Sequence, residues 1–433
     1  MSKKLWCTLS LALASCAGAP DSADPVADAW PGGKSDTSNQ ATILDFEWSG
    51  TVQTNALDWG GERAVMESLL YYTVGELNGS RSVGRMDRVE YTSLTSAPTK
   101  DGRVEVSYHA KMPVAWGSKD KLPKSYTFKL PKNVDQFDAF TTKYKGACSE
   151  ETDEGIDVSS MWYYYRPSQS SCKLDDADVV RSTAKVTVST ANTTGKYPEY
   201  DKVWEDNTLR VVAIFGKFAK GDTDKDDDAG INAFNQFNSD IRDRMGSMKG
   251  LVTIPADAPT QPGANLPDVE FQATLADGRS VIVNALLVDE VSSATQAFYD
   301  RYEALSTRAD FIAYNGHAGL GANIRTLASK GKFVAGQYVI VFMNGCDTYT
   351  YVDGALAEMR ATLNPDDPTG TKFMDFALNA EPAFFASDSG ASMAFINGLL
   401  SYDKPLTYEQ ILSNIDTAQV VLVSGEQDNT FKP

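Results

Sequence analysis

The chain has 433 residues and a formal net charge of −18, and 42% of its residues are hydrophobic. This length and apolar share are sufficient for two domains with cores of their own. A strongly acidic surface argues against binding to nucleic acid and against general adhesion to anionic lipid. Only five cysteines and two histidines are present, so few residues can supply thiol or imidazole chemistry.

The first residues have the pattern of an export signal. Two lysines precede an apolar segment, residues 5–14, which is too short to span a bilayer, so residues 1–15 are predicted to be a signal peptide. The segment ends in the sequence LASC, which resembles the bacterial lipobox. That resemblance implies that Cys16 carries lipid, that the mature chain lies in the bacterial cell envelope, and that it contacts the membrane through the lipid alone. An ordinary signal peptide with a chance cysteine is the alternative.

Residues 16–40 are mostly Ala, Asp, Pro, Gly and Ser, with few large apolar groups. Such a segment cannot bury enough surface to order itself, so we predict a flexible tether between the lipid and the folded protein. The remaining chain is predicted to form an N-terminal α+β domain over residues 41–205 and an α/β domain over residues 206–433.

The predicted N-terminal domain combines one helix with strands that have one wet face. Apolar and polar residues alternate over 44–48, 104–108 and 126–130, as in half-buried strands. Residues 62–77 place apolar side chains on one helical face. His109 falls on the polar face of its strand and is therefore interpreted as a solvated residue rather than a catalytic one.

Processing leaves three cysteines in the mature chain. Cys148 and Cys172 bracket a polar, acidic segment and are predicted to form a disulfide in an oxidising compartment, contributing on the order of 3 kcal/mol. The aromatic run Trp162–Tyr165 within that loop either stacks on a ligand or packs beneath the loop. Cys346 is left unpaired, which makes it a candidate nucleophile, the alternative being an inert buried thiol.

A second pattern, in which strands alternate with helices, begins near Leu209. It predicts an α/β layered sandwich with a mainly parallel sheet. The predicted elements are a strand over 209–215, a helix with Ile231, Phe234, Ile241 and Met245 inward, a hairpin over 269–288, a helix opened by Ser292, strands over 311–314 and 338–343, helices over 355–363, 393–400 and 407–415, and a last strand over 420–423.

Two of these strands stop at an Asn-Gly pair and then present a reactive side chain. Residues 311–314 lead through Asn-Gly to His317, and residues 338–343 lead through Asn-Gly to Cys346. Asn-Gly breaks a strand because both residues tolerate positive φ. In parallel sheets the ligand crevice lies at the carboxyl ends of the strands, so the imidazole and the thiol are expected to converge there.

The motifs FIAYNGHAG (residues 311–319) and VIVFMNGCD (residues 339–347) together resemble those of the caspase and gingipain group of cysteine peptidases. The resemblance implies a caspase-like layered fold over about 209–423. It also implies that Cys346 attacks a peptide carbonyl, that His317 protonates the leaving amine, and that the N–H groups of Ala318 and Cys346 hold the oxyanion. The substrate would be a protein or peptide, and no cofactor would be required.

The sequence differs from the peptidase group at two positions and contains two further candidate sites. Ala318 stands where the group usually has glycine, and Asp347 next to the thiol would disfavour the thiolate if it points inward. Asp388 falls where the group builds its first specificity pocket and would favour a basic side chain. Alternating acids suggest a possible calcium site formed by Asp222, Asp224 and Asp226, although an acidic solvated loop explains the same pattern.

Three classes of function remain open from the sequence. The first is a lipid-anchored cysteine endopeptidase that uses His317 and Cys346. The second is a member of the same fold without activity, which binds peptides or glycan. The third is an unrelated envelope or adhesion lipoprotein.

Overall fold

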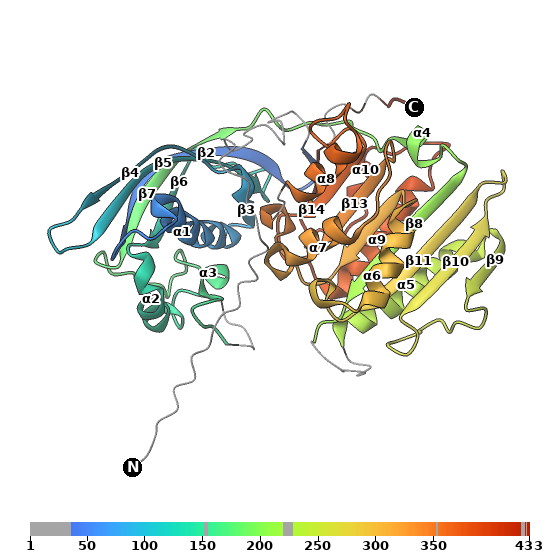
Figure 1. Cartoon of the computed structure of the whole chain (residues 1–433), viewed down its shortest axis with the longest axis horizontal. Coiled ribbons are helices and arrows are strands. Elements are labelled where there is room, and N and C mark those ends of the chain that lie inside the picture. The colour runs from blue at the N-terminus through green and yellow to red at the C-terminus, as the bar shows by residue number, and fades with distance from the viewer. Residues whose placement is uncertain (1–35, 151–154, 220–227, 352–353, 426–428, 430) are drawn as a thin grey trace, which may run out of the picture.

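The computed structural model describes residues 36–150, 155–219, 228–351, 354–425, 429 and 431–433. The predicted signal peptide, Cys16, and the possible calcium ligands Asp222, Asp224 and Asp226 lie outside these residues. The described residues form two sheets, which lie side by side in Figure 1. We call residues 41–205 the N-terminal region and residues 206–433 the C-terminal region.

The C-terminal region supplies eight strands of a nine-stranded mixed sheet with strand order β1-β15-β14-β13-β12-β8-β11-β10-β9, and the ninth, β1 (Thr37–Ser38), precedes the N-terminal region. The five central strands from β14 to β11 are parallel, and the strands at both edges are antiparallel. The prediction of a mainly parallel arrangement is therefore confirmed for the centre of the sheet. The strands are β8 (Thr208–Gly216), β9 (Lys249–Ile254), β10 (Asp268–Thr274), β11 (Ser280–Val288), β12 (Phe311–Asn315), β13 (Val339–Asn344), β14 (Met374–Asn379) and β15 (Val421–Ser424).

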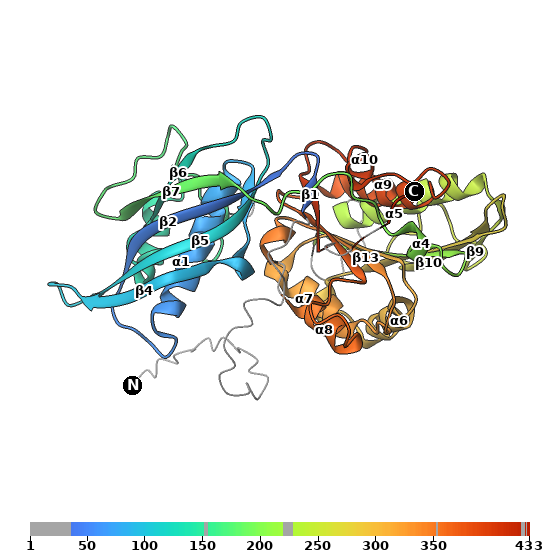
Figure 2. The same ribbon diagram turned by 90° about the horizontal axis from the view of Figure 1, so that it is seen from above.

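Helices cover both faces of this sheet (Figure 2). Alternate residues of β8 face opposite cores: Val211 packs in the cluster that contains α5, α9 and α10, while Val212 packs in the cluster that contains α6, α7 and α8. Continuous apolar strands are expected where both faces are buried. The helices are α5 (Ala229–Gly246), α9 (Phe385–Leu399) and α10 (Tyr408–Leu412) on one face, and α6 (Gln296–Ser306), α7 (Ala322–Lys330) and α8 (Ala355–Leu363) on the other.

The N-terminal region is a curved six-stranded antiparallel sheet with α1 lying across its concave face (Figure 1). The apolar face predicted for α1 is buried against the sheet, and His109 lies on the opposite, wetter face, as expected. The elements are β2 (Thr42–Thr54), α1 (Gly61–Asn78), β3 (Ser82–Gly84), β4 (Glu90–Pro98), β5 (Val104–Trp116), β6 (Ser125–Pro131), α2 (Phe137–Tyr144), α3 (Met161–Tyr164) and β7 (Val179–Val188), followed by α4 (Tyr200–Val203) in the connection to β8.

Cys148 and Cys172 form the predicted disulfide, with an S–S distance of 1.94 Å. The disulfide closes the loop that carries α3. Within this loop Trp162 and Tyr165 are buried, so packing explains part of the aromatic run. Gly75 of α1 leaves room for the contact, because a Cβ atom there would lie 1.6 Å from the Trp162 carbonyl oxygen. The loop is thus fastened to α1 as well as to its own ends.

Several element boundaries differ from the predictions, and α9 begins at Phe385 rather than near residue 393. The tether ends before residue 40, because Thr37–Ser38 form β1, and the Ser38 hydroxyl donates to the Val421 carbonyl at 2.7 Å. A short edge strand of small polar residues has no apolar pattern to reveal it. The helix expected from Ser292 begins later, after Thr295, whose hydroxyl accepts a hydrogen bond from the Phe298 N–H.

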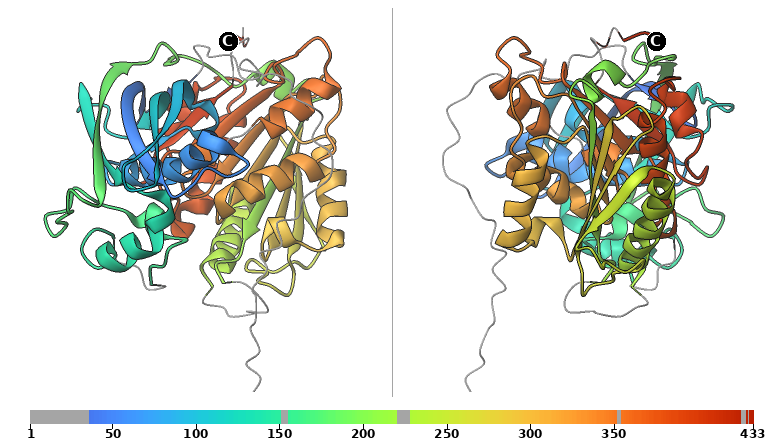
Figure 3. Two further views of the ribbon diagram at one scale, coloured as in Figure 1. Left: turned by 60° about the vertical axis from the view of Figure 1, so that its left-hand side comes forward. Right: turned by 90° about the vertical axis from the view of Figure 1, so that its right-hand side faces the viewer.

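The N-terminal region lies beside the β14–β15–β1 edge of the larger sheet (Figures 1 and 3). Arg85 is 1% exposed at this junction, and its guanidinium lies 5.4 Å from the centre of the Tyr349 ring. One cluster of buried apolar residues runs without interruption from the antiparallel sheet to the side of the larger sheet that α7 and α8 cover. The two regions therefore share part of their core.

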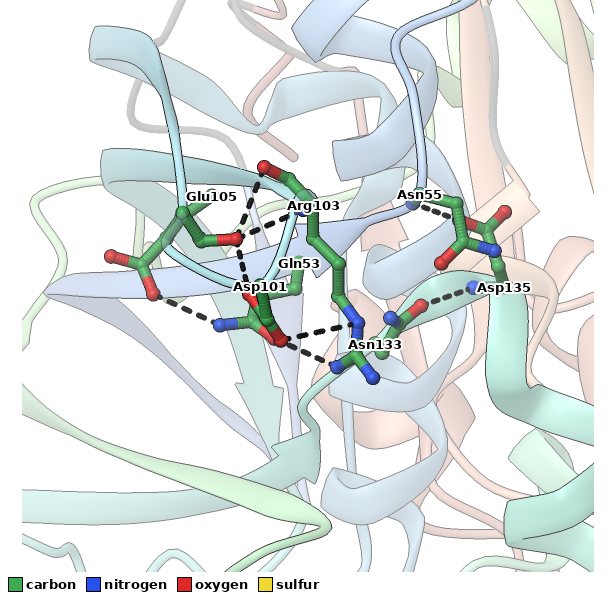
Figure 4. A network of polar contacts seen from close by, with 8 residues as sticks. Gln53, Asn55, Asp101, Arg103, Glu105, Asn133 and Asp135 are labelled. Atoms are coloured by element: carbon green, nitrogen blue, oxygen red, sulfur yellow. Dashed lines mark hydrogen bonds and ion pairs between the residues drawn. The ribbon is translucent and has the colours of Figure 1, made fainter.

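A polar network holds the opposite end of the antiparallel sheet (Figure 4). The Arg103 guanidinium donates to the Gln53 side-chain oxygen at 3.2 Å and lies 3.6 Å from the Asp101 carboxylate. The Asp135 carboxylate accepts from the Asn55 N–H and the Thr54 hydroxyl. These contacts satisfy polar groups at strand ends, where the ladder hydrogen bonds stop.

Candidate functional site

A buried row of asparagine side chains fixes the carboxyl ends of three parallel strands. Asn315 ends β12, Asn344 ends β13 and Asn379 ends β14, and each is 0% exposed. The Asn344 amide donates to Asn315 at 3.0 Å and accepts from Asn379 at 2.7 Å. It also donates to Asp388 of α9 at 2.9 Å. Buried amides held by several hydrogen bonds are rigid, so the turns that follow these strands have defined starting points.

His317 and Cys346 follow two neighbouring strand ends at the same distance along the chain. Asn315 and Asn344 are aligned partners in the parallel β12–β13 ladder, and each candidate residue lies two positions further on. The turns are also in contact, because a Cβ atom on Gly345 would lie 2.7 Å from the Gly316 carbonyl oxygen and 3.2 Å from the Ala318 nitrogen. This close approach explains why glycine rather than alanine precedes the cysteine. The two turns therefore meet, whereas the predicted convergence of the imidazole and the thiol stays a prediction.

His317 is exposed and held by the residue that follows β8. Its Nε2 atom lies 3.0 Å from the Phe218 carbonyl oxygen. A carbonyl can only accept, so the hydrogen bond assigns the proton to Nε2 and leaves the lone pair on Nδ1. The imidazole also packs against two aromatic rings, with centroid distances of 5.4 Å to Phe218 and 5.3 Å to Phe385.

Cys346 is partly buried, and its environment favours the neutral thiol. The thiol donates a weak hydrogen bond to the Ala383 carbonyl oxygen at 3.7 Å. Burial raises the pKa of Cys346 to about 11, and the neighbouring Asp347 carboxyl adds to the rise. At pH 7 about one molecule in 10⁴ would then carry the thiolate. No hydrogen bond joins Cys346 to His317, both of which lie in the described part of the chain.

Tyr163 of α3 lies beside the Cys346 thiol, although it belongs to the N-terminal region. Its hydroxyl is close enough to lower the pKa of both Cys346 and Asp347 by hydrogen bonding, and the two neighbours together with burial raise the pKa of Tyr163 well above its usual range. The sequence left open whether the aromatic run stacks on a ligand or packs beneath the loop, and at this one ring the neighbour is the candidate nucleophile. The sequence carried no sign of this contact.

Asp347 points inward, which is the orientation in which its carboxyl disfavours the neighbouring thiolate. It is 1% exposed and lies in the left-handed region with φ of 52°, and its carboxylate accepts a hydrogen bond of 3.0 Å from Asn78 of α1. Burial raises its pKa to about 7. Glu381, whose backbone carbonyl accepts from the Asp347 N–H, is also buried, and its pKa is raised to about 8 by burial and then by Asp347.

The backbone donors expected for an oxyanion are free of other partners. Across the described residues, neither the Ala318 N–H nor the Cys346 N–H donates to a protein acceptor. Both belong to the two turns that meet at Gly345. Unpaired N–H groups at adjoining turns are suited to receive a developing negative charge.

The remaining predicted residues lie away from this cluster or inside the protein. Asp388 is 1% exposed and bonded to Asn344, which speaks against its lining a solvent-facing pocket for a basic side chain, and burial raises its pKa well above the usual range. His109 contacts Ser49 and Glu47 on the outer strand face. Among the described residues, no group of His, Cys, Asp and Glu could hold a metal ion.

A cavity of about 110 Å³ lies in the N-terminal region and contains none of these residues. Two of the three cations that line it are neutralised within the region: Arg103 lies near Asp101, and Lys143 pairs with Asp178 at 2.6 Å. Its lining residues include no cysteine and no histidine.

Comparison of the chain with protein-family models, with curated proteins and with solved structures found no match in any of the three. Within the described ranges, every helix is too short or too polar to cross a lipid bilayer. The assignment of function therefore depends on the geometry of the cluster around Cys346 and His317.

Proposed function

We propose that this chain is a cysteine peptidase in a covered, latent form, with Cys346 as nucleophile and His317 as its proton-transfer partner. The observation that carries the proposal is the alignment of Asn315 with Asn344, which sets His317 and Cys346 equally far beyond two adjacent parallel strands. The contact between the turns at Gly345 brings those backbone segments together. We also infer that the C-terminal region has the caspase-like layering that its motifs imply.

The proposed reaction assigns one role to each of these groups. The Cys346 sulfur forms a bond to the substrate carbonyl carbon, and the oxyanion is received by the Ala318 and Cys346 N–H groups. His317 takes the thiol proton on Nδ1 and gives it to the leaving amine as the C–N bond breaks. Water then hydrolyses the thioester and restores the thiol. The Phe218 carbonyl would stabilise the imidazolium through Nε2–H.

The covered state explains why a nucleophile would have a raised pKa. Tyr163 and the buried Asp347 carboxyl lie next to the thiol, and Asn78 of α1 donates a hydrogen bond to that carboxyl. Moving the α3 loop away would admit water and lower the cost of the thiolate. In this proposal the N-terminal region keeps the enzyme inactive until that loop moves.

The proposed location is the bacterial cell envelope, with lipid on Cys16 as the anchor. Its support is the charged, apolar and LASC sequence of residues 3–16, together with a disulfide-distance cysteine pair that suits an oxidising compartment. Membrane contact would then be limited to the lipid, and the protein surface would face water.

An inactive peptide-binding or adhesion module is the second candidate. The observation that favours it is the environment of Cys346, which disfavours the thiolate, combined with the lack of a His317–Cys346 hydrogen bond in the described residues. The same turns could then hold a peptide without cleaving it.

Labelling with a peptidyl acyloxymethyl ketone separates these candidates. We expect the full chain in detergent to be labelled at Cys346, slowly in the parent and faster in Tyr163→Ala. Labelling should be lost in Cys346→Ala and in His317→Ala. His109→Ala is the matched control and should label like the parent. If neither the parent nor Tyr163→Ala reacts at Cys346, the peptidase proposal is wrong and the binding module is favoured.

A further inference from the structure

Two aromatic rings pack against His317, and two further exposed apolar side chains lie close to these residues in the sequence. Phe218, Leu320 and Phe384 are 48%, 54% and 47% exposed, and they come from three separate segments of the chain. Phe385 completes the group, because its ring lies 5.6 Å from that of Phe218 and 5.3 Å from that of His317. We call these four residues the aromatic rim. A single exposed apolar residue needs no explanation, but several around one candidate catalytic group do.

The aromatic rim is continuous with the candidate catalytic atoms. The Phe218 backbone carbonyl holds His317, while its ring faces the same imidazole at 5.4 Å. On the other side, the Ala383 carbonyl accepts from the Cys346 thiol and immediately precedes Phe384. A substrate placed with its scissile bond between His317 and Cys346 would therefore meet these rings with a flanking side chain.

Leu320 carries backbone strain at an exposed position. Its φ is 51°, a conformation that leucine rarely adopts, and its side chain is 54% exposed. The left-handed region is unfavourable for a leucine, and burial of the side chain does not compensate for this here. Backbone strain near a candidate site suggests that the side chain has a function, such as contact with a bound peptide.

We propose that the aromatic rim selects peptides with an aromatic or large aliphatic side chain beside the scissile bond, in place of the basic side chain that a pocket at Asp388 would take. This inference deepens the proposed function and rests on it for the position of the scissile bond. Apolar side chains gain affinity by removing surface from water, and ring-on-ring contacts add to that gain. Asp388, in contrast, is buried and engaged by Asn344.

Peptide binding to the full Cys346→Ala chain tests the inference without relying on catalysis. The probes are three fluorescein-labelled alanine pentapeptides with Phe, Lys or Asp at the centre, measured by fluorescence anisotropy. We expect the Phe peptide to bind at least about tenfold more tightly than the other two. Phe218→Ala and Phe384→Ala, each added to Cys346→Ala, should remove that preference. Phe218→Leu should keep much of it, since leucine retains apolar surface.

The controls separate this inference from the peptidase proposal. Trp59→Ala removes a fully exposed aromatic ring of the N-terminal region, so it should leave the preference unchanged. Phe218→Ala retains the backbone carbonyl that holds His317, so a loss of binding reports on the ring. Equal binding of the three peptides, or a preference that survives both rim substitutions, overturns the inference. Rim-dependent binding together with an unreactive Cys346 in the parent supports the inference and removes the peptidase activity.

Discussion

Asn78 of α1 donates a hydrogen bond of 3.0 Å to the carboxylate of Asp347, the residue that follows the candidate nucleophile. This contact joins α1 of the N-terminal region to the turn after β13 in the C-terminal region, next to the covered thiol. It also holds a carboxyl that is 1% exposed and whose pKa burial raises to about 7. Stability, thiol reactivity and pH are therefore expected to be coupled at this junction.

The first prediction concerns Asp347 and pH. Its pKa is near 4 when unfolded and about 7 when folded, so its contribution to stability is fully present below pH 4 and is lost as pH rises to about 7. Glu381 extends the loss toward pH 8. Asp347→Asn keeps an acceptor for Asn78 and tolerates positive φ, but it cannot ionise. The free energy of unfolding can be measured in urea at pH 5 and pH 8 for the parent and for Asp347→Asn. The difference, variant minus parent, should be larger at pH 8 than at pH 5 by a few kcal/mol. An equal difference at both pH values would contradict this.

The second prediction concerns Tyr163 as the cover of the thiol. Tyr163→Ala removes a hydrogen bond that lowers the pKa of Cys346, but it should also admit water to the thiol. Because burial is the larger effect, the pKa should move from about 11 toward the usual value near 8.5. Alkylation of Cys346 by iodoacetamide at pH 7 should then accelerate by about ten- to a hundredfold. Tyr164→Ala, the adjacent substitution, is the matched control. Similar rates for both variants would mean that Tyr163 does not cover the thiol.

The third prediction concerns the disulfide that closes the α3 loop. Replacing both Cys148 and Cys172 by Ser should destabilise the N-terminal region by about 3 kcal/mol, because a loop of this length is no longer constrained. The loop carries Tyr163, so Cys346 should also become more reactive. Mass spectrometry of the alkylated chain measures the second effect. Reactivity that stays at the parent rate would show that packing against α1 is sufficient to hold the loop.

The fourth prediction concerns the asparagine row. Asn344→Ala removes partners of Asn315, Asn379 and Asp388, all of them buried, and should lower the free energy of unfolding by about 3 kcal/mol or more. Asn397→Ala is the control, because Asn397 is exposed and, among the described residues, its side chain bonds only Arg244. Its substitution should change stability by less than about 0.5 kcal/mol. Comparable losses in both variants would remove the structural role assigned to the row.

Elements with a strong period were predictable from the sequence. The apolar run that forms β8, the inward face of α5 and the hairpin of β10 and β11 were all expected, because burial on one or both faces imposes a readable pattern. The positions of His317 and Cys346 past two strand ends were also expected, since Asn-Gly breaks a strand locally.

Contacts between distant segments were not predictable. Tyr163 stands in a run of four aromatic residues, and nothing in that run distinguishes the ring that reaches Cys346 from those that pack on α1. The position of Asp388 along the chain predicted that it lines a pocket. The orientation of its side chain depends instead on a hydrogen bond from Asn344, which lies on another element. Such outcomes are set by tertiary packing rather than by local propensity.

The apolar cluster that passes uninterrupted from the antiparallel sheet to the α7 and α8 side of the larger sheet limits how activation can proceed. Complete separation of the N-terminal region would expose apolar surface on both regions, and that surface would promote aggregation. Any physiological trigger, whether a protease or a binding partner, should therefore act on the small stapled loop around Tyr163 and leave the two halves joined.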